Sequence, residues 1–294
     1  MKKKALAERY RVVEGKHFRL GDYDPGDTWK LESKDHAQQW LEEGVARLSE
    51  LQDRLYAQNQ WALLVVFQAT DTAGKDGTIK HVMSGVNPQG CQVFSFKAPS
   101  EEDLDHDFLW RTARCLPERG RIGIFNRSYY EEVLVVRVHP DLLERQQLPR
   151  EVVTKRIWKE RFESINAHEL HLARNGVMVL KFFLHLSKAE QRRRLLSRLE
   201  ESDKNWKFSL ADIREREHWD EYARAYEEMI SHTASRHAPW FVVPADHKWF
   251  TRLVVAEVIV QALESLKLAW PEVDAEKRKA LAKVRRVLES ETEA

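Results

Sequence analysis

The sequence predicts an α/β fold built on a five-stranded parallel sheet with helices packed against it. Three observations lead to this prediction. Five short apolar runs alternate with longer stretches of helical periodicity, as in sheets whose strands are joined by right-handed crossovers. The first run leads into a Gly-Lys loop and a helix start. The chain of 294 residues, 43% of them hydrophobic, suits one large α/β domain or two small ones.

Composition and charge narrow the class of protein. Charged residues make up 32% of the chain but nearly cancel to a net charge of +1, so binding of a polyanion must come from local clusters of cations. Cys91 and Cys115 lack metal-binding or redox spacing, which favours a reducing, cytoplasmic setting. The start MKKKALAERY shows no signal-peptide pattern, and no apolar run approaches the length of about 20 residues that crosses a membrane. We therefore expect neither a membrane partner nor, since no such motif is present, a nucleic-acid partner.

The chain begins with a polar, irregular extension over residues 1–34, in which Pro25-Gly26-Asp27 marks a turn. Residues 35–60 place their apolar side chains near one face, which predicts a long amphipathic helix that packs on the sheet. We expect residues 35–268 to form the main domain and the strongly charged residues 269–294 to form an exposed, partly helical tail.

The stretch from Trp61 to Thr78 is the one around which the chain is organised. Its apolar residues 62–67 predict a buried strand, residues 68–74 a tight loop, and Lys75 the start of a helix. This is the geometry of a phosphate-binding loop, where backbone N–H groups and the helix dipole face an anion and a lysine adds charge. The other loop residues expected to bind phosphate are Thr72, Ala73, Gly74, Asp76, Gly77 and Thr78.

The loop departs from the common G-x-x-x-x-G-K-[ST] pattern in two places. Ala69 stands at the first glycine, and Asp76 stands where Ser or Thr normally holds Mg²⁺. Asp71 is unusual because a carboxylate beside phosphates is repelled unless a cation lies between them, so it is a candidate metal ligand. The alternative interpretation is a Gly-Lys turn in an ordinary strand-to-helix connection, since short motifs of this kind also occur there.

Four further strands and their helices follow along the chain. Ser100 with three acids after it predicts a helix start, Asn175-Gly176 a helix end and Ser187 an N-cap. The H-E-x-H order at residues 168–171 does not place its histidines i, i+4 apart, so we expect no zinc site there. The strands are expected at residues 92–96, 121–125, 177–186 and 240–244, and the helices at 100–117, 149–175, 188–201, 209–233 and 249–268.

Cations gather in residues 188–218, in contrast to the near-neutral chain as a whole. The helix at 188–201 is rich in arginine, and Arg194 and Arg198 lie i, i+4 apart, where they present together. Lys204 and Lys207 follow. One interpretation is a solvated helix face, which is the usual role of a charge run. The other is a lid that closes over phosphates, as in P-loop nucleoside-monophosphate kinases.

The loop resembles that of the polyphosphate kinase 2 family, which reads roughly G-x-D-A-A-G-K-x-G where this chain has Ala69–Gly77. Further blocks of the same family pattern appear in order over about residues 15 to 268, so the resemblance covers nearly the whole chain. These blocks are Ser95–Pro99, Asp107–Arg111, Gly123–Val138, Asn205–Ser209 and Ala238–Trp240.

The resemblance implies a P-loop kinase-like three-layer α/β/α fold and phosphoryl transfer between inorganic polyphosphate and a nucleoside phosphate, with Mg²⁺ or alternatively Mn²⁺. It implies that Asp71 holds the metal ion and that Lys75 and Arg127 act on the transferring phosphoryl group. It also implies that Arg137 lines the polyphosphate path, that the lid cations close over the substrates, and that the protein is a homo-oligomer, either a dimer or a tetramer. The alternative role for Arg127 is to form a surface salt bridge.

Asn126 separates this chain from the broader family pattern, which has Asp at this strand end. The Asn form, followed by Tyr-Glu-Glu-Val-Leu-Val-Val-Arg-Val, looks like the class III subgroup that accepts both AMP and ADP. The loss of a charge at position 126 would shift metal binding onto Asp71 and onto Asp76 or Glu131. The resemblance therefore implies reversible formation of ADP and ATP from AMP and ADP, with other nucleoside mono- and diphosphates as further candidate acceptors.

Two other functions stay open at this stage. One is an ATP-dependent small-molecule kinase on the same scaffold, although Asp71 and the missing Ser or Thr after Lys75 argue against a standard ATP site. The other is a non-catalytic polyanion or nucleic-acid binder, since basic residues and ten tryptophans allow phosphate contact and stacking.

Overall fold

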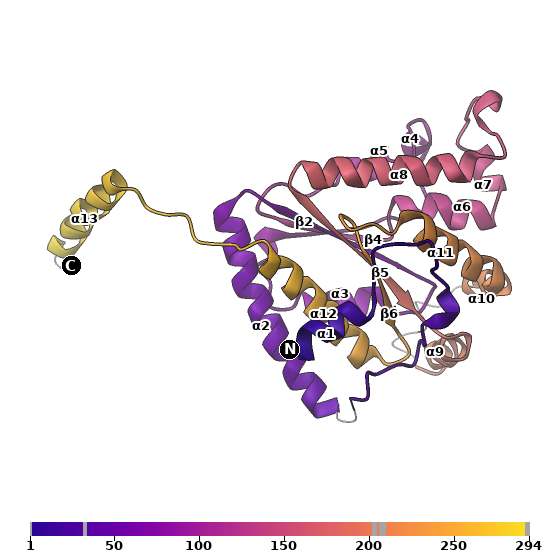
Figure 1. Cartoon of the computed structure of the whole chain (residues 1–294), viewed down its shortest axis with the longest axis horizontal. Coiled ribbons are helices and arrows are strands. Elements are labelled where there is room, and N and C mark those ends of the chain that lie inside the picture. Colours follow the sequence, from indigo (N-terminus) through magenta and orange to yellow (C-terminus); the bar gives the residue numbers. More distant parts are fainter. Residues whose placement is uncertain (1, 32–33, 202–204, 206–209, 292–294) are drawn as a thin grey trace.

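The computed structural model describes residues 2–31, 34–201, 205 and 210–291, and these contain one six-stranded sheet (Figure 1). The strands follow one another across the sheet in the order β1-β6-β5-β2-β4-β3. Their bounds are β1 (Arg11–Val12), β2 (Ala62–Ala69), β3 (Cys91–Ser95), β4 (Ile122–Asn126), β5 (Val177–His185) and β6 (Trp240–Pro244).

All five predicted strands are present and run parallel, but the prediction of a five-stranded sheet is wrong by one strand. The sixth strand, β1, comes from the N-terminal extension and pairs antiparallel with β6, with Arg11 opposite Phe241. β1 has two residues, which is too few to show the alternation by which a strand is recognised in a sequence. The extension therefore closes one edge of the sheet.

β2 lies in the middle of the sheet, and all eight of its residues are buried. A parallel strand covered by helices on both faces reads as a continuous apolar run, which is why the sequence located it. Phe67 of β2 pairs with Asn126 of β4, and Asn126 pairs in turn with Ser95 of β3. The register therefore brings the carboxyl ends of these strands to one edge, beside the loop that follows β2.

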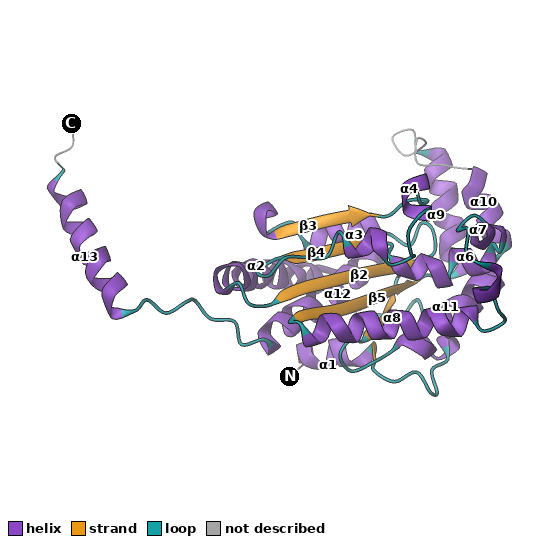
Figure 2. Cartoon of the chain, turned by 90° about the horizontal axis from the view of Figure 1, so that it is seen from above, coloured by secondary structure: helices purple, strands orange, loops and turns teal. Residues whose placement is uncertain are grey.

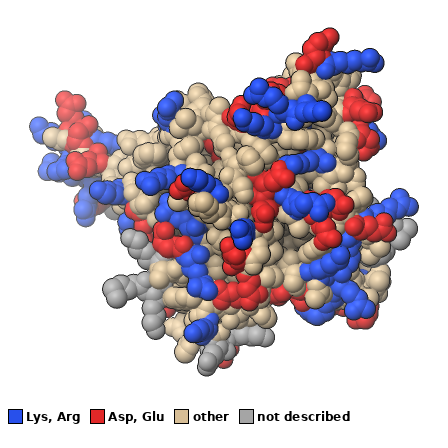
Figure 3. All heavy atoms as spheres, turned by 45° about the vertical axis from the view of Figure 1, so that its right-hand side comes forward, with Lys and Arg blue, Asp and Glu red and all other residues tan. Residues whose placement is uncertain are grey.

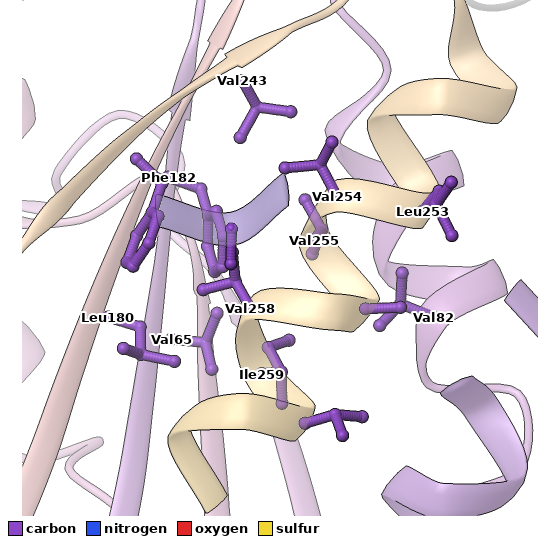
Figure 4. Packing of buried hydrophobic residues seen from close by; sticks show 14 of the residues in the cluster. Val65, Val82, Leu180, Phe182, Val243, Leu253, Val254, Val255, Val258 and Ile259 are labelled. Carbon is purple, nitrogen blue, oxygen red and sulfur yellow. The ribbon is translucent and has the colours of Figure 1, made fainter. Parts of the chain in front are cut away.

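One face of the sheet is covered by four helices: α1 (Lys2–Arg9), α2 (Lys34–Gln58), α3 (Lys75–Val82) and α12 (Lys248–Ser265). Figure 2 shows this layer beside the strands. In Figure 4 Val254 and Val258 of α12 face Val65, Leu180 and Phe182 of the strands. All five of these side chains are buried. This layer joins α3, and so the loop before it, firmly to the sheet.

The other face is covered by α8 (Ile157–Arg174), α11 (Trp219–Thr233) and the 3₁₀ turn η3 (Tyr129–Val133). They pack on the alternate strand residues, which include Leu64, Val66 and Phe183. The shorter elements at this side are α4 (Glu101–Leu104), α5 (Trp110–Ala113), α6 (Val135–Val138), α7 (Asp141–Glu144) and η4 (Arg150–Val152), and η2 (Pro88–Gly90) precedes β3.

Three predicted helices differ from the structure, and the one expected at 209–233 forms two helices, α10 (Leu210–Glu217) and α11, with His218 between them. The helix expected at 100–117 begins with the expected Ser100 cap but is broken into α4 and α5, because the Asp107 carboxylate accepts the N–H of Leu109 (2.9 Å) in a local turn. The helix expected from Pro149 begins at Ile157 instead, since Pro149 has extended backbone angles and only the short η4 follows it.

The helices α9 (Lys188–Glu200) and α10 (Leu210–Glu217), which the sequence assigned to a lid, lie at the carboxyl edge of the sheet beside α11 (Figure 1). Ser187 caps α9 as predicted, and its hydroxyl accepts the N–H of Glu190 (3.1 Å). Lys204 and Lys207, which the sequence placed in the lid, lie outside the described residues.

The two chain ends differ, and the expectation of an irregular N-terminal extension is wrong because its first residues form α1. Leu6 and Tyr10 of the N-terminal extension belong to the core below α12, and the 3₁₀ turn η1 (Leu20–Asp22) is tied to α11 through the N–H of Leu20, which donates to Glu227 Oε2 (2.7 Å). The C-terminal α13 (Ala275–Ser290) stands away from the body in Figures 1 and 2. None of its residues, all of which the structure describes, is buried, as the predicted exposed tail requires.

The described helices include none with both the length and the apolarity that a membrane crossing demands.

We predict that Gly15→Ala destabilises the protein. A Cβ at Gly15 would lie 1.9 Å from the backbone carbonyl oxygen of Ser231 on α11, so the extension must move away from this helix. Overpacking of this kind costs about 1–3 kcal/mol, which urea unfolding at constant temperature will measure.

The matched control is Gly21→Ala in the same extension, where an added Cβ would meet no described atom within 4 Å. This variant should change the free energy of unfolding by less than about 0.5 kcal/mol. Equal stability of the two variants would contradict the packing of the extension on α11.

Candidate functional site

The loop between β2 and α3 curls twice with left-handed backbone angles. Thr72 has φ +66° and Gly74 has φ +99°, and Gly74 is the residue immediately before α3. Glycine adopts this angle without the steric cost that other residues meet. Among the described residues no side chain caps the N-terminus of α3, so the N–H groups of its first turn are available to an anion.

Arg194 of α9 holds this loop in shape. Its guanidinium donates to the carbonyl oxygens of Thr72 and Ala73 (both 3.0 Å) and, on the other side, to those of Ala245 (2.6 Å) and Asp246 (3.1 Å). Its Nε donates to Glu190 Oε1 (2.8 Å), and the side chain is 6% exposed. Arginine suits this task because its planar fork carries five donors in fixed directions. The loop is therefore clipped to the residues after β6.

Glu190 supports the same clip. It forms ion pairs with both Arg193 and Arg194, and hydrogen bonds from Arg193 hold its pKa at about 2, with a further contribution from Arg194. The carboxylate therefore stays ionised at neutral pH and keeps the arginine fork in place.

Four charged side chains meet at the carboxyl edge of the sheet. Lys75 Nζ donates to the Ala69 carbonyl oxygen (3.0 Å), and Arg127 Nη2 lies 3.3 Å from Asp71 Oδ1. Arg127 Nη1 lies 4.0 Å from Glu131 Oε2. Burial lowers the pKa of Lys75, an effect that the nearby Asp71 opposes, and burial raises the pKa of Glu131 against the opposing charge of Arg127. Two cations and two carboxylates thus lie close together at this edge of the sheet.

The oxygen atoms at this edge of the sheet suit the binding of a divalent cation. Asn126 Nδ2 donates to Asp76 Oδ1 (2.6 Å), and the hydroxyls of Thr70 and Thr72 are buried with no partner among the described residues. In the described ranges no three His, Cys, Asp or Glu side chains form a metal cluster by themselves. Mg²⁺ is typically bound by one or two carboxylates and completes its shell with water and substrate phosphates, so this donor set suits it.

A cleft of about 520 Å³ opens in front of the loop. Cations dominate its charged lining, whereas on the face drawn in Figure 3 Lys and Arg are interspersed with Asp and Glu. The cations of the cleft are Lys75, Lys97, Arg127, Arg193, Arg194, Arg198, Lys248 and Arg252. A chain with a near-neutral net charge needs a local cluster of cations to bind a polyanion, and such a cluster is present at the loop.

A second pocket of about 290 Å³ lies on the other side of Asp71 and Arg127, which line both cavities. Its character differs from that of the cleft, because aromatic rings and carboxylates dominate it. The lining includes Glu131, Asp212, Glu215, Arg216, Trp219, Tyr222 and Tyr226.

Glu215 is fixed in the wall of this second pocket. It accepts hydrogen bonds from Tyr222 Oη (2.6 Å) and from His139 Nε2 (3.0 Å). Burial opposes its ionisation, but these hydrogen bonds outweigh burial and lower its pKa. The pocket therefore holds an ionised carboxylate next to aromatic surface.

The sequence model of the family described as Polyphosphate kinase 2 (PPK2) matches residues 30–270. This chain belongs to the polyphosphate kinase 2 family. A polyphosphate kinase 2 relative from Rhodopseudomonas palustris, named ADP-polyphosphate phosphotransferase, is 54% identical over 286 residues, which are 97% of this chain and 99% of the relative. One from Meiothermus ruber, named AMP/ADP-polyphosphate phosphotransferase, is 42% identical over 273 residues, or 92% and 98% of the two chains.

The fold agrees with a solved member of the polyphosphate kinase 2 family. The crystal structure of polyphosphate kinase 2 from Arthrobacter aurescens superposes with a TM-score of 0.86 at 38% identity and covers 97% of both chains.

Most site residues that the sequence proposed lie together in this polyphosphate kinase 2 fold. Arg198 lines the cleft and lies 3.1 Å from Asp212. Arg137 lies elsewhere: it pairs with Glu228 (2.6 Å) and lines neither the cleft nor the second pocket. The predicted residues that line the cleft are Asp71, Thr72, Ala73, Gly74, Lys75, Asp76, Gly77, Thr78, Asn126, Arg127, Arg194 and Arg198.

Arg194 differs from the expected closing cation in its surroundings. The sequence grouped it with Arg198 as a pair that presents together, but its donors face the backbone of the loop and of residues 245–246. The i, i+4 spacing shows which residues share a helix face and does not show what that face meets.

Several lining residues were not assigned from the sequence. Lys97 follows a predicted strand end, and Lys248 is the first residue of α12, directly after the loop that follows β6, where ligands gather in such sheets. Arg252 is one helical turn after Lys248, so the same signal reaches it. Trp219 and Tyr222 fall on the apolar face of the helical stretch predicted at 209–233, and periodicity does not distinguish core residues from residues that line a pocket.

We predict that Asn126→Asp makes the stability of the protein depend on a divalent cation. The change replaces the amide donor, now 2.6 Å from Asp76 Oδ1, with a second carboxylate that repels the first. In EDTA the variant should melt several degrees below the wild type, because about 1 kcal/mol corresponds to roughly 2–4 °C at this chain length. MgCl₂ should raise its Tm more than that of the wild type.

The control is Asn166→Asp, since Asn166 Nδ2 donates to the His232 carbonyl oxygen (2.8 Å) away from the cleft. MgCl₂ should not raise the Tm of this variant beyond that of the wild type in a calorimetric scan. An equal response of Asn126→Asp and the wild type to MgCl₂ would argue against a cation site at Asp76.

Proposed function

We propose that this protein transfers phosphoryl groups from inorganic polyphosphate to AMP and ADP, reversibly, with Mg²⁺ as the divalent ion and Mn²⁺ as a second candidate. One observation carries the proposal: a cationic cleft and an aromatic, acidic pocket share the Asp71–Arg127 pair. Two substrates of different chemistry thereby reach the same two side chains from opposite sides. The names of the relatives from Rhodopseudomonas palustris and Meiothermus ruber support polyphosphate and these nucleotides as the substrates.

The cleft suits polyphosphate as the phosphoryl donor. Its charged lining continues past the loop to Lys97 and to Lys248 and Arg252 on α12, so a row of phosphates meets cations along its length. A nucleoside would use little of this lining. We assign the loop, Arg193 and Arg198 to the polymer.

The second pocket suits the nucleoside of the acceptor. Trp219 and Tyr222 offer faces on which a base can stack. Asp212 and Glu215 accept hydrogen bonds from ribose hydroxyls or an exocyclic amine, and they repel a polyanion. The acceptor phosphates then point toward Asp71 and Arg127, which line the shared wall.

In the proposed reaction an oxygen of the acceptor's terminal phosphate attacks the terminal phosphorus of polyphosphate. A new P–O bond forms, the P–O bond to the polymer breaks, and the electron pair of that bond leaves with the shortened polymer. Lys75 and Arg127 neutralise charge on the transferring group, and the N–H groups of the loop hold the donor in line. A divalent ion held by Asp71 supplies further charge neutralisation. Positioning and electrostatics carry this chemistry, since little covalent help is needed.

Asn126 bears on which nucleotides are accepted. Its amide donates to Asp76, so one negative charge fewer lies at the strand end than in the broader family pattern. We propose that metal binding rests on Asp71, with Asp76 and Glu131 nearby, and that AMP and ADP are both substrates.

We also propose a cytoplasmic, homo-oligomeric protein, either a dimer or a tetramer. Its two cysteines form no disulfide within the described residues, which suits a reducing compartment.

We predict that long-chain polyphosphate and MgCl₂ convert AMP to ADP and then to ATP, with each product followed by chromatography. Lys75→Ala and Arg127→Ala should each lower kcat by about 10³ or more, because each removes a cation that neutralises transition-state charge. Glu118→Ala is the control, since Glu118 is an exposed partner of Arg121 outside both cavities and should retain activity.

Each other outcome of this assay has a clear meaning. Phosphorylation of ADP alone would retain the polyphosphate reaction and exclude the AMP/ADP subgroup. Transfer from ATP to a small molecule, without polyphosphate, would favour the ATP-dependent kinase. Binding of single-stranded nucleic acid at low salt with no transfer would favour the non-catalytic binder. Full turnover by Lys75→Ala would contradict the role of the loop.

We predict that Trp219→Ala raises the KM for ADP about tenfold and leaves the KM for polyphosphate unchanged, because loss of base stacking costs about 1–3 kcal/mol. Steady-state kinetics with each substrate varied in turn will measure both constants. Trp270→Ala, at a tryptophan that is 59% exposed in the C-terminal segment, is the matched control and should change neither constant. A rise in the KM for polyphosphate instead would reverse the assignment of the two cavities.

A further inference from the structure

A fully buried ion pair lies beneath the site and is unused by the proposed chemistry. Lys181 of β5 and Glu169 of α8 are both 0% exposed, and Lys181 Nζ lies 2.6 Å from Glu169 Oε2. Burying two charges costs several kcal/mol per ion, and apolar replacements of buried pairs are often equally stable. Stability alone is therefore a poor explanation of this pair, and its other contacts point to a different role.

Those contacts join the pair to two consecutive tyrosines. Glu169 Oε1 accepts hydrogen bonds from Tyr129 Oη (2.9 Å) and Tyr130 Oη (2.7 Å). Lys181 Nζ donates to Tyr130 Oη (2.9 Å) and to the carbonyl oxygen of Thr233 (2.8 Å), the last residue of α11. Burial raises the pKa of both phenols well above the usual value, so both remain donors. Because the partners are charged, these bonds are stronger than ordinary ones.

The two tyrosines lie in the turn formed by residues 127–134, which also contains Arg127 and Glu131. Arg127 has φ +65°, a left-handed angle that is costly for a side-chain-bearing residue, and its N–H donates to the Phe67 carbonyl oxygen (3.1 Å). Glu131 follows Tyr130 directly and lies 4.0 Å from the Arg127 guanidinium. The side chain of Tyr130 thus contacts the ion pair, whereas the side chain of the next residue, Glu131, lies at the site.

The rest of the turn is held in the same manner. Buried Gln68 of β2 donates to Glu131 Oε1 (2.8 Å) and accepts from the Ser128 hydroxyl (3.0 Å). Arg161 of α8, which is 5% exposed, donates to the carbonyl oxygen of Glu132 (2.9 Å) and pairs with its carboxylate (3.2 Å). Helix α8 therefore contacts the turn through charged groups at two places, at Tyr129–Tyr130 and at Glu132.

We propose that Lys181 and Glu169 are positioning residues for the phosphoryl-transfer site: through Tyr129 and Tyr130 they fix the turn that orients Arg127 and Glu131. The proposal rests on the proposed function for its catalytic consequence. Through the Thr233 carbonyl the same lysine ties the end of α11, whose other residues Trp219, Tyr222 and Tyr226 line the second pocket. One buried pair thereby sets the Arg127 turn and one wall of the acceptor pocket relative to the sheet.

Tyr130→Phe is the test variant, because it removes one hydroxyl and leaves the ion pair intact. A small displacement of a positioned group lowers turnover steeply, and we expect kcat to fall by at least about 10-fold. The KM values for ADP and polyphosphate should stay within about twofold, since binding is shared among many other residues. Tyr10→Phe is the matched control, because Tyr10 Oη also donates to a carboxylate, Asp27 Oδ2 (3.0 Å), but far from the cleft. It should leave kcat unchanged.

A double-mutant cycle tests whether the effect passes through Arg127. In an Arg127→Lys background, Tyr130→Phe should lower kcat by less than about threefold, since the group that it positions is already altered. Equal fold-losses in the two backgrounds would overturn the proposal, and so would an unchanged kcat in Tyr130→Phe alone.

Hydrogen exchange provides a measurement that does not depend on activity. Backbone amides of residues 127–134 should exchange faster in Tyr130→Phe than in the wild type and in Tyr10→Phe, with the melting temperature taken in parallel to confirm folding. Unchanged exchange in this turn would overturn the proposal. A wild-type protein that transfers nothing from polyphosphate would instead defeat the proposed function, and the exchange result would still decide whether the ion pair holds the turn.

Discussion

A parallel sheet brings the carboxyl ends of its strands to one edge, and every polar feature of this site depends on that constraint. β2 delivers the Gly74-Lys75 loop to the edge, β4 delivers Asn126 and Arg127, and β5 leads into α9. The two cores on either face of the sheet keep these strand ends in register. Side chains that are distant in sequence therefore meet within hydrogen-bonding distance, as Asp76 and Asn126 do (2.6 Å).

Electrostatics in this protein act locally. The net charge of +1 gives no general attraction for a polyanion, yet the cleft is lined mainly by cations while its neighbour across Asp71 and Arg127 is acidic and aromatic. Such a division sorts ligands by charge at short range, where screening by salt is weakest. Three buried charged groups, those of Lys181, Glu169 and Arg161, form ion pairs within the protein. These ion pairs give rigidity to the turn that contains Arg127 and Glu131.

The sequence allowed prediction of those parts of the fold that local signals encode. Buried strands, the Ser100 and Ser187 caps and the Gly-Lys loop were found because each is written in a few adjacent residues. The two-residue β1 was missed because its pairing with β6 is set by tertiary contacts alone. The same reason explains Arg194, whose spacing indicated a helix face but not the backbone carbonyls beneath it, and Tyr222, whose ring lines a pocket rather than the core.

The hydrogen bonds from Arg194 to the loop between β2 and α3 have a thermodynamic consequence. Thr72, a β-branched residue, is kept at φ +66°, a conformation that a free loop would seldom visit. Arg194 enforces this conformation through the carbonyls of Thr72 and Ala73, so the entropy of ordering the loop is lost during folding. An incoming phosphate chain then binds a loop that is already ordered, so the entropy of ordering this loop does not reduce the binding free energy. The loop is in this sense preorganised by a cation that the ligand itself need not touch.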